Sequence, residues 1–436
     1  GAGMACAVEA KDNGVENVLI IEKGDQIGGT TAMSQGMIAG WDTQLQKSQG
    51  VELTYDAMYA NLMNNASYHL DPALTKITVE NSGKTIDWLI DRVGVKFTDQ
   101  IDIYYGPLQM MHNVDGAGGG FVTAFTACLD QLGVEIQKGT KLVEVLLDAE
   151  GKTEGAVVEA KGKTQRIKAR AIMIATGGYA YNAELAARFD PEKAGTFGIG
   201  HPNCEGEGLV AASNAGALLS HTNDMMCVVK DYTIMSEHNG TSASANLNGF
   251  TNLPNMILVG ADGKRFVDET VEMSLLNNYL RDGKHPGWYS QVFDANYMTD
   301  AAGWKGKLVD PEGLRVYMPE EDVERKGVFA DQVRTFKADT LEELAVKIGQ
   351  DPATFVKTVE DYNALCEAGA DTEFGKDPKY LIPVKQAPFY GIHRRMRCST
   401  ICAGLEVNGE NQALTAEGEP IEGLYVIGNC AGNFYG

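Results

Sequence analysis

The sequence lacks the features that mark membrane-spanning, disulfide-rich and metal-binding proteins. None of its 436 residues lie in an apolar run of about 18 or more, so no membrane span is expected. Eight cysteines are present, but there is no Cys-x-x-Cys pair. Cys398 and Cys402 stand four apart without a second ligand pair. No metal or iron–sulfur site is therefore expected, and free buried thiols are predicted.

Positive charge is also scarce. The chain has 37 Lys and Arg against 59 Asp and Glu, which gives a net charge of -22. Such a surface repels phosphate backbones and anionic membranes, so nucleic acid is excluded as an expected partner. No basic and apolar signal segment is visible, and the location stays open between the cytoplasm and export after folding. The hydrophobic content of 44% supports a large core and two domains.

The opening stretch GAGMACAVEAKDNGVENVLIIEK has the order of a nucleotide-binding unit. Residues 1–13 have helical periodicity, Gly14 ends that helix, and residues 17–23 read as a buried parallel strand. Glycines let backbone N–H groups approach a pyrophosphate, and Glu22 can accept ribose hydroxyls. The order is that of a βαβ unit without its first strand. The alternative is an ordinary turn with a surface Glu.

Further elements follow along the chain. A glycine-rich turn, GDQIGGTTAMSQGM, is followed by an amphipathic helix expected over 78–97, closed by Gly94. Residues 140–178 predict a strand meander, and the middle of the chain contains the strand–turn–strand NMILVGADGKRFVDE. One helix is expected to start at Thr340, with Glu343 at the capping-box position, and another over 352–368. The stretch EGLYVIGN predicts a last strand and a glycine turn.

Six ordered stretches give the sequence a family resemblance: the opening unit, GGTTAMSQGM, IMIATGGYAYN, GHPNCEGEGLVAASNAGA, GKRFVDE and EGLYVIGN. Together they resemble the fumarate reductase/succinate dehydrogenase flavoprotein family, which includes 3-ketosteroid dehydrogenases and urocanate reductase-like enzymes. The resemblance implies FAD as cofactor and an α/β fold. That fold is a three-layer Rossmann-like FAD-binding domain (1–221 and 400–436) with an inserted α+β capping domain (222–399). Because Gly1-Ala2-Gly3 matches the last three residues of the family's GxGGAG run, the chain is expected to be a fragment, truncated at both ends.

The resemblance also implies the FAD contacts. Ala2 and Gly3 would lie at the pyrophosphate and Glu22 at the ribose. Glu207 stands in place of an Asp in the family's GDG, and Asn429 in place of a Glu. The remaining implied cofactor residues are Lys23, Gly28, Gly29, Thr30, Thr31, Gln35, Gly36, Leu142, Ala175, Thr176, Gly177 and Gly428.

The positions that carry the family's fumarate chemistry are different here. Met273 stands where the family has an Arg proton donor, and Asn248 and Gly249 stand where it has a Thr-Glu pair. Val228 and Ser399 replace two histidines. Met and Val neither donate a proton nor bind a carboxylate. These departures contradict a fumarate reductase and favour a larger, less anionic substrate, such as an enone, an aryl acrylate or a steroid-like ring.

Other polar residues of the expected capping domain are candidates for the missing proton donor. His393, Arg395 and Arg397 share one face if FYGIHRRMRCST is a strand, and that face could meet a substrate anion. Ion pairing with the excess carboxylates is the alternative. Tyr232 lies in a segment that caps the cleft in the family, although such a residue is often simply exposed. The candidate catalytic residues are therefore Arg397, Tyr232 and His393.

Two further histidines stand near glycines. His201 is expected to shape a turn beside Glu207. His112 precedes the run NVDGAGGG, whose glycines suggest close backbone approach to a ligand or to the flavin.

The function expected from the resemblance is an FAD-dependent oxidoreductase that transfers hydride from the flavin to an activated C=C of a non-fumarate enoate or enone. Its partners would be a small unsaturated substrate and an unknown electron donor, an attached or separate FMN or haem domain. Two alternatives stay open: a flavin-dependent dehydrogenase of a ketone or steroid-like substrate, and a non-catalytic flavin-binding electron carrier.

Overall fold

The computed structural model describes most of the chain, and backbone alone at 225–231 and 395–401. The described residues are 1–66, 68, 70–103, 108–189, 201–220, 225–231, 255–271, 276, 288–300, 309–325, 328, 333–401 and 403–432. The chain forms two compact units, which we call unit 1 (1–191, 200–225 and 400–436) and unit 2 (192–199 and 226–399). The domain boundaries expected from the sequence were 221/222 and 399/400.

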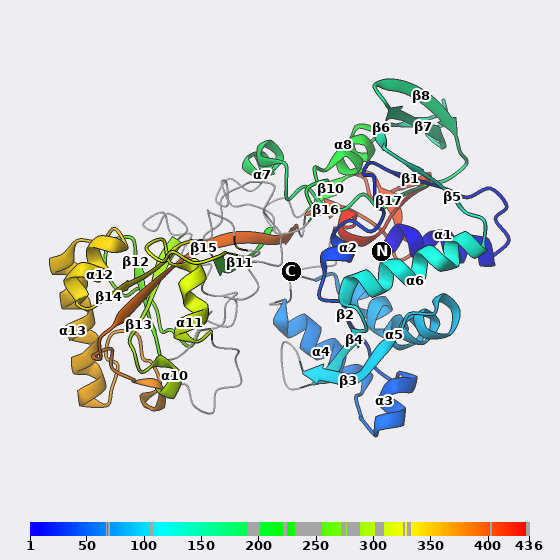
Figure 1. The fold of residues 1–436 in the computed structure, drawn as a ribbon. Coiled ribbons are helices and arrows are strands. Elements are labelled where there is room, and N and C mark those ends of the chain that lie inside the picture. The colour runs from blue at the N-terminus through cyan, green and yellow to red at the C-terminus, as the bar shows by residue number, and fades with distance from the viewer. Residues whose placement is uncertain are drawn as a thin grey trace. The chain divides into compact units, whose positions relative to one another are not determined.

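Unit 1 begins with the helix and strand expected from the opening stretch (Figure 1). Helix α1 (Ala2–Asp12) starts directly after Gly1 and buries Met4, Ala7 and Val8, the i, i+3, i+4 face. These side chains pack in one core with residues of α6 (Ala117–Gln131). Strand β1 (Leu19–Glu22) then pairs in parallel with β5 (Glu135–Lys138).

A second parallel pair lies at the end of unit 1. Strand β9 (Ile172–Ile174) runs parallel to β18 (Pro420–Val426), and β17 (Gln412–Leu414) completes the order β17-β18-β9. The meander expected over 140–178 is confirmed up to Lys168 as the antiparallel sheet β6-β7-β8, whereas residues 172–174, expected in its last strand, form β9 of the other sheet. The other elements of unit 1 are α2 (Thr30–Met33), β2 (Met37–Ala39), α3 (Gln44–Gln49), α4 (Tyr55–Asn65), β3 (Phe97–Ile103), β4 (Gln109–Val114), β6 (Thr140–Leu147), β7 (Thr153–Ala160), β8 (Lys163–Lys168), α7 (Ala183–Phe189), α8 (Glu207–Asn214), β10 (Leu219–Ser220), β16 (Gly404–Leu405) and the 3₁₀ turn Gly428–Cys430.

The helix expected over 78–97 begins earlier and changes character before its end. It is observed as α5 (Pro72–Trp88), continued by a π-helical turn (Leu89–Val93). Asp71 caps the backbone N–H groups of Ala73 and Leu74, and Pro72 follows it. An Asp-Pro start of this kind is a strong helix N-terminus, and the amphipathic pattern alone did not reveal it. Gly94, with φ of 82°, ends the helix as expected.

Unit 2 is built on a sheet in which β12, β13, β14 and β15 pair antiparallel, with helices α12 and α13 in one core with it. Its sheet has the order β11-β15-β13-β12, with β14 also paired to β15. Its elements are β11 (Met225–Asp231), β12 (Ile257–Gly260), β13 (Trp288–Phe293), α10 (Tyr297–Asp300), α11 (Pro311–Leu314), the 3₁₀ turn Arg315–Tyr317, β14 (Thr335–Ala338), α12 (Leu341–Lys347), α13 (Pro352–Ala368), the 3₁₀ turn Pro378–Tyr380 and β15 (Phe389–Ile401).

Both helices predicted in unit 2 are confirmed. Thr340 accepts the Glu343 backbone N–H at the start of α12, and Asp351 caps α13 in the same way. Leu344 and Phe355, one on each helix, are fully buried in one core with Val292 of the sheet. Helix α13 therefore buries one apolar stripe against the strands and exposes the opposite face.

Membrane-spanning helices and metal-binding groups were sought among the described residues. Among the described residues, no helix is both long and apolar enough to cross a membrane. The same residues contain no group of three or more His, Cys, Asp or Glu arranged to hold a metal ion. Among the cysteines whose side chains the structure describes, the free thiols are Cys6, Cys128, Cys204, Cys366 and Cys430.

Candidate functional site

Three glycine-containing turns meet in unit 1. A methyl group added to Gly3 would lie 3.2 Å from Ala175 Cβ, and one added to Gly428 would lie 3.1 Å from Ala2 Cβ. Ala175 follows β9 and Gly428 follows β18, and because these strands are parallel, both turns lie at their carboxyl ends. Helix α1 has no side-chain cap. Its first N–H groups are therefore donors for an anion, at the positive end of the helix.

Cys430 joins two of these turns. Its side chain is fully buried, and its Sγ accepts a hydrogen bond from Gly177 N (3.1 Å) and donates to Gly177 O (3.3 Å). Thr176 Oγ1 lies 3.4 Å from the same sulfur. Burial raises the pKa of this thiol to about 11, so it is neutral at physiological pH. No role was predicted for Cys430 from the sequence, although its place in the last glycine turn was a visible signal.

The glycine-rich loop that contains Thr30 and Thr31 packs against Gly1 at the start of α1. A methyl group on Gly1 would lie 2.7 Å from Thr31 Oγ1. Thr30 Oγ1 accepts the His201 N–H (3.2 Å) and lies 3.3 Å from Cys204 Sγ. His201 Nδ1 in turn accepts from Asn203 N (3.1 Å), which confirms its predicted role in shaping the turn. The loop at 30–31 thus connects the glycines at the start of α1 to the turn before α8.

Helix α8 is held against the same region. A methyl group on Gly208 would lie only 2.2 Å from Thr176 Oγ1, so only glycine permits this approach. Four stretches of sequence that are far apart in the chain (1–3, 30–31, 175–177 and 428–430) are therefore brought together. All four contain residues that the sequence predicted at the cofactor.

The glycine run after His112 packs closely against the protein's own backbone. A methyl group on Gly118 would lie 2.0 Å from the Thr31 carbonyl oxygen, and one on Gly120 would lie 2.1 Å from Asp115 O. Gly118 N also donates to Ser34 O (3.0 Å). Gly118 and Gly120 therefore approach the protein's own backbone closely at the start of α6, and a contact of this run with a ligand stays a prediction.

Glu22 lies at the carboxyl end of β1, where a ribose-binding acid is expected. Its Oε1 accepts the Gly24 N–H at 2.7 Å, which fixes the carboxylate in the turn. Strand β1, which ends at Glu22, contacts α1, as expected for a βαβ unit.

Lys23 is engaged by protein carboxylates. Its Nζ lies 2.7 Å from Glu205 Oε2 and pairs even more closely with Glu207. Burial opposes the charge on Lys23, but the hydrogen bonds to both carboxylates raise its pKa overall. Glu205 was not singled out from the sequence, although an acid two residues before Glu207 was a visible signal.

The remaining predicted cofactor residues stay predictions. Gly29, with φ of 49°, is the N-cap of α2, and Gly28 precedes it in the same left-handed region. Gln35 is exposed and Gly36 is buried at the end of this loop. Leu142 lies buried in β6, just before an irregularity in the pairing with β7. Asn429 lies in the 3₁₀ turn between Gly428 and Cys430.

The pattern of an FAD binding domain matches residues 1–436. The chain belongs to this FAD-binding family. FAD is therefore its cofactor, and the Rossmann-like FAD-binding fold expected from the sequence is confirmed.

Known relatives cover the whole chain. The vinyl phenol reductase of Lactiplantibacillus plantarum is 28% identical over 100% of this chain and 89% of that protein. The NADH:fumarate oxidoreductase of Klebsiella pneumoniae is 24% identical, and the match spans 44% of its length. Among solved structures, the open conformation of a flavocytochrome c3 fumarate reductase has a TM-score of 0.78 at 22% identity, covering 100% of this chain and 72% of that one.

The residues that meet in unit 1 fit FAD. Gly1 to Gly3 present bare backbone and uncapped helix N–H groups, which suit a diphosphate. The Glu22 carboxylate suits a ribose diol at the end of the neighbouring strand. The turns at 175–177 and 428–430 have glycines with φ of 81° and 64°, which let the backbone pass closely without side chains.

The predicted catalytic residues fall in unit 2 and are only partly described. Tyr232 lies outside the described residues, as do Met273, Asn248 and Gly249. Arg397 lies in β15, where only its backbone is described. The predicted strand over FYGIHRRMRCST is confirmed as β15, which spans all of it.

His393 is the one catalytic candidate whose side chain is described. Its ring lies 5.1 Å from the rings of both Trp288 and Phe336, and its Nε2 donates to Ile348 O at 3.1 Å. Burial lowers its pKa to about 4. The ring is therefore neutral at pH 7 and adds no charge to the face that it was expected to share with Arg395 and Arg397.

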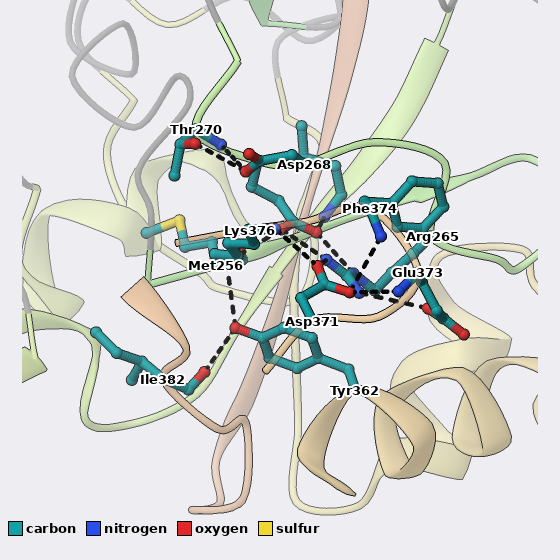
Figure 2. A network of polar contacts seen from close by, with 12 residues as sticks. Met256, Arg265, Asp268, Thr270, Tyr362, Asp371, Glu373, Phe374, Lys376 and Ile382 are labelled. Atoms are coloured by element: carbon teal, nitrogen blue, oxygen red, sulfur yellow. Dashed lines mark hydrogen bonds and ion pairs between the residues drawn. The ribbon is translucent and has the colours of Figure 1, made fainter. Parts of the chain in front are cut away.

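The GKRFVDE motif forms a buried charge cluster in unit 2 (Figure 2). Arg265 pairs with both oxygens of Glu269 (2.9 and 3.0 Å) and with Asp371 (2.9 Å). Lys376 Nζ lies 3.0 Å from Glu269 Oε2 and 3.1 Å from Tyr362 Oη. Burial opposes the charge on Arg265, but its carboxylate partners raise its pKa overall. We call these four charged residues (Arg265, Glu269, Asp371 and Lys376) the buried cluster.

Proposed function

We propose that the protein reduces an activated carbon–carbon double bond in an unsaturated compound that is less anionic than fumarate, such as an enone, an aryl acrylate or a vinyl phenol. FAD, when bound, supplies hydride to such a bond. The observation that carries the proposal is the meeting of the Gly1–Gly3, Ala175–Gly177 and Gly428–Cys430 turns beside Glu22, because this is the arrangement that an FAD needs.

The residues around the cofactor have separate tasks in this proposal. The backbone N–H groups at the start of α1 bind the diphosphate, and Glu22 orients the adenosine through its ribose. Cys430, a neutral thiol, keeps the turns after β9 and β18 at a fixed spacing. A fixed spacing matters because hydride transfer depends on a small range of distances between cofactor and substrate.

The substrate class is inferred from the residues that replace the family's charged and polar groups. Met273, Val228 and Ser399 replace groups that would bind a dicarboxylate or donate a proton in the resembled family. The 28% identical relative is a vinyl phenol reductase, whose name points to a substrate without a carboxylate. Arg397 and Tyr232 remain the proposed proton donors, and a reductase needs one at the carbon beside the one that receives hydride.

The proposal is tested with the full-length protein and anaerobic spectroscopy. The protein is purified, its FAD content is measured, and its flavin is reduced with dithionite, so that the natural donor, an FMN or haem domain, is not needed. Return of the flavin absorbance on adding an enone, an aryl acrylate or a vinyl phenol supports the proposal, and the saturated product identifies the bond that was reduced. Bleaching of the oxidised flavin by a saturated ketone, or no reoxidation by any alkene, contradicts it.

A further inference from the structure

An asparagine that was not predicted at the cofactor lies beside the acid at the end of β1. A methyl group added to Gly24 would lie 2.7 Å from Asn203 Nδ2 and 3.3 Å from Glu22 Oε1. The amide nitrogen of Asn203 and the carboxylate of Glu22 therefore border the same spot, over the bare Cα of Gly24. The amide nitrogen is a hydrogen-bond donor and the carboxylate is an acceptor. A ligand group that both donates and accepts can use the two together.

The polar atoms at this spot are available to a ligand. Glu22 Oε1 accepts the Gly24 N–H at 2.7 Å, and no group in the described part of the chain donates to the other carboxylate oxygen, Oε2. The side-chain amide of Asn203 likewise makes no hydrogen bond to any residue that the structure describes. Both residues are half-buried. Polar atoms that are partly shielded from water lose free energy without a partner, so a ligand that pairs with both is favoured.

Asn203 is held in place by the backbone of its own loop. Its N–H donates to His201 Nδ1 at 3.1 Å, and its carbonyl oxygen accepts the Glu205 N–H at 3.0 Å. The His201 N–H in turn donates to Thr30 Oγ1 at 3.2 Å. The position of Asn203 is therefore set before a ligand arrives, which reduces the entropy that is lost on binding.

The chemistry of the pair fits a ribose hydroxyl. A hydroxyl group donates one hydrogen bond and accepts others. Glu22 can accept from such a hydroxyl, because an acid at the end of this strand is where a dinucleotide places its adenosine ribose. Asn203 can donate to the same hydroxyl. A phosphate group suits the pair less well, because it has no proton to give Glu22 and shares its negative charge.

We propose that Asn203 is a further FAD-binding residue, which donates a hydrogen bond to a hydroxyl of the adenosine ribose beside Glu22. The proposal rests on FAD as the cofactor and does not depend on which double bond is reduced. It makes the loop before α8 a direct part of adenosine recognition. The contribution of Asn203 to FAD affinity is then present only when the ribose carries that hydroxyl.

The test is a fluorescence titration of the full-length apoprotein with FAD and with two FAD analogues, whose adenosine ribose lacks either the 2′-hydroxyl or the 3′-hydroxyl. Asn203→Ala is expected to weaken FAD binding roughly three- to tenfold, as the loss of one neutral hydrogen bond does. Asn203→Asp keeps the size of the side chain but replaces the donor with a second carboxylate, and should weaken binding at least roughly tenfold. For one of the two analogues, Asn203→Ala and the wild-type protein should bind equally tightly.

Two controls separate this role from a structural one. Asn81→Ala removes another asparagine of unit 1, whose amide donates to Ile77 O at 2.8 Å on α5, and leaves FAD affinity unchanged. Circular dichroism of each apoprotein shows whether a variant is folded before it is titrated. A purely structural role of Asn203 would weaken the binding of FAD and of both analogues by the same factor, because the loop would be misplaced for every ligand.

The proposal is overturned if Asn203→Ala binds FAD as tightly as the wild-type protein, or if its loss of affinity is the same for FAD and for both analogues. Neither result would affect the proposed reduction of a double bond. Failure of the wild-type protein to bind FAD would instead contradict the cofactor assignment, on which both proposals rest.

Discussion

The two units each contain a cluster in which cations meet carboxylates, and the clusters differ in exposure. The side chains of the buried cluster in unit 2 are at most 2% exposed. Those of Lys23, Glu205 and Glu207 in unit 1, which form the Lys23 cluster, are between 22% and 53% exposed. Buried charges must be fully matched, because an unpaired one has no water to solvate it. Exposed charges are screened, so their partners can change at little cost in stability. The same pairing of cations with carboxylates is therefore expected to contribute more to stability in unit 2 than in unit 1.

The composition of each cluster agrees with this difference. The buried cluster has two cations and two anions, and the backbone N–H groups of Glu373 and Phe374 also donate to Asp371. Arg265 lies 4.7 Å from the ring of Tyr362, which covers its other side. The Lys23 cluster has one cation for two anions and keeps a net negative charge. Only a solvated site tolerates such an imbalance.

The largest expected effect comes from breaking the buried cluster. Glu269→Gln removes the carboxylate that pairs with Lys376 and leaves Arg265 with Asp371 and the more exposed Glu373. Two buried cations then share too few negative charges, which should cost about 3–5 kcal/mol of stability in unit 2. Hydrogen exchange of β12 and α13, followed by mass spectrometry, locates the loss. The control Lys357→Met removes an exposed pair with Asp361 on the same helix and should change nothing measurable. Equal protection of β12 in both variants would show that the buried cluster does not stabilise unit 2.

A second prediction concerns acid stability of unit 2. The pKa of His393 is about 4 in the folded protein against 6.5 as its ordinary value, so the unfolded chain binds the proton first. Stability is therefore complete above about pH 6.5 and falls as the pH is lowered toward 4, by on the order of 3 kcal/mol. His393→Gln, which keeps a donor for Ile348 O, should flatten this part of the pH profile. Denaturant titrations between pH 7 and 4.5 measure it, and an unchanged slope would show that another group titrates.

A third prediction uses two adjacent glycines of α6. Gly118→Ala places a methyl group 2.0 Å from Thr31 O, whereas Gly119→Ala meets nothing within 4 Å. The first change should cost about 1–3 kcal/mol and displace the 30–36 loop, weakening FAD binding. The second should be neutral or stabilise the helix by up to about 1 kcal/mol. Thermal unfolding and FAD titration of both variants check this, and equal behaviour would contradict the packing of α6 on the loop.

The smallest effect is expected for Lys23→Met on stability. Because this cluster is partly exposed, the free energy of unfolding of apo unit 1 should fall by at most about 1 kcal/mol, and less in high salt. Urea titration of the apoprotein measures it beside Glu269→Gln. A loss as large as that of Glu269→Gln would remove the distinction between the two clusters.

Local patterns predicted much of the fold and part of the site. Gly1 to Gly3 and Glu22 could be placed because a glycine loop, a helix and a strand with a terminal acid occur within one short stretch. The start of α12 followed from its capping residue Thr340, and α13 was placed at 352–368 without its cap, Asp351, being recognised. The start of α5 at Pro72 was missed because only the apolar pattern was used, although Asp71-Pro72 was visible.

The long-range pairings could not be predicted in this way. Arg265 meets Asp371, which lies 106 residues further along the chain, and Lys23 meets Glu205 across 182 residues. No local rule selects one carboxylate among the 59 acidic residues for either cation. For the same reason the aromatic surroundings of His393 were invisible, since Trp288 and Phe336 come from other strands.

The central claim is tested most directly by the substrate preference of the dithionite-reduced flavin. The full-length protein is mixed anaerobically with fumarate or with a vinyl phenol or aryl acrylate, and the single-turnover rate of flavin reoxidation is compared. Reoxidation by the aryl compounds is expected to be at least roughly tenfold faster than by fumarate, because Met273 and Val228 offer no partner for a second carboxylate. Faster reoxidation by fumarate would contradict it.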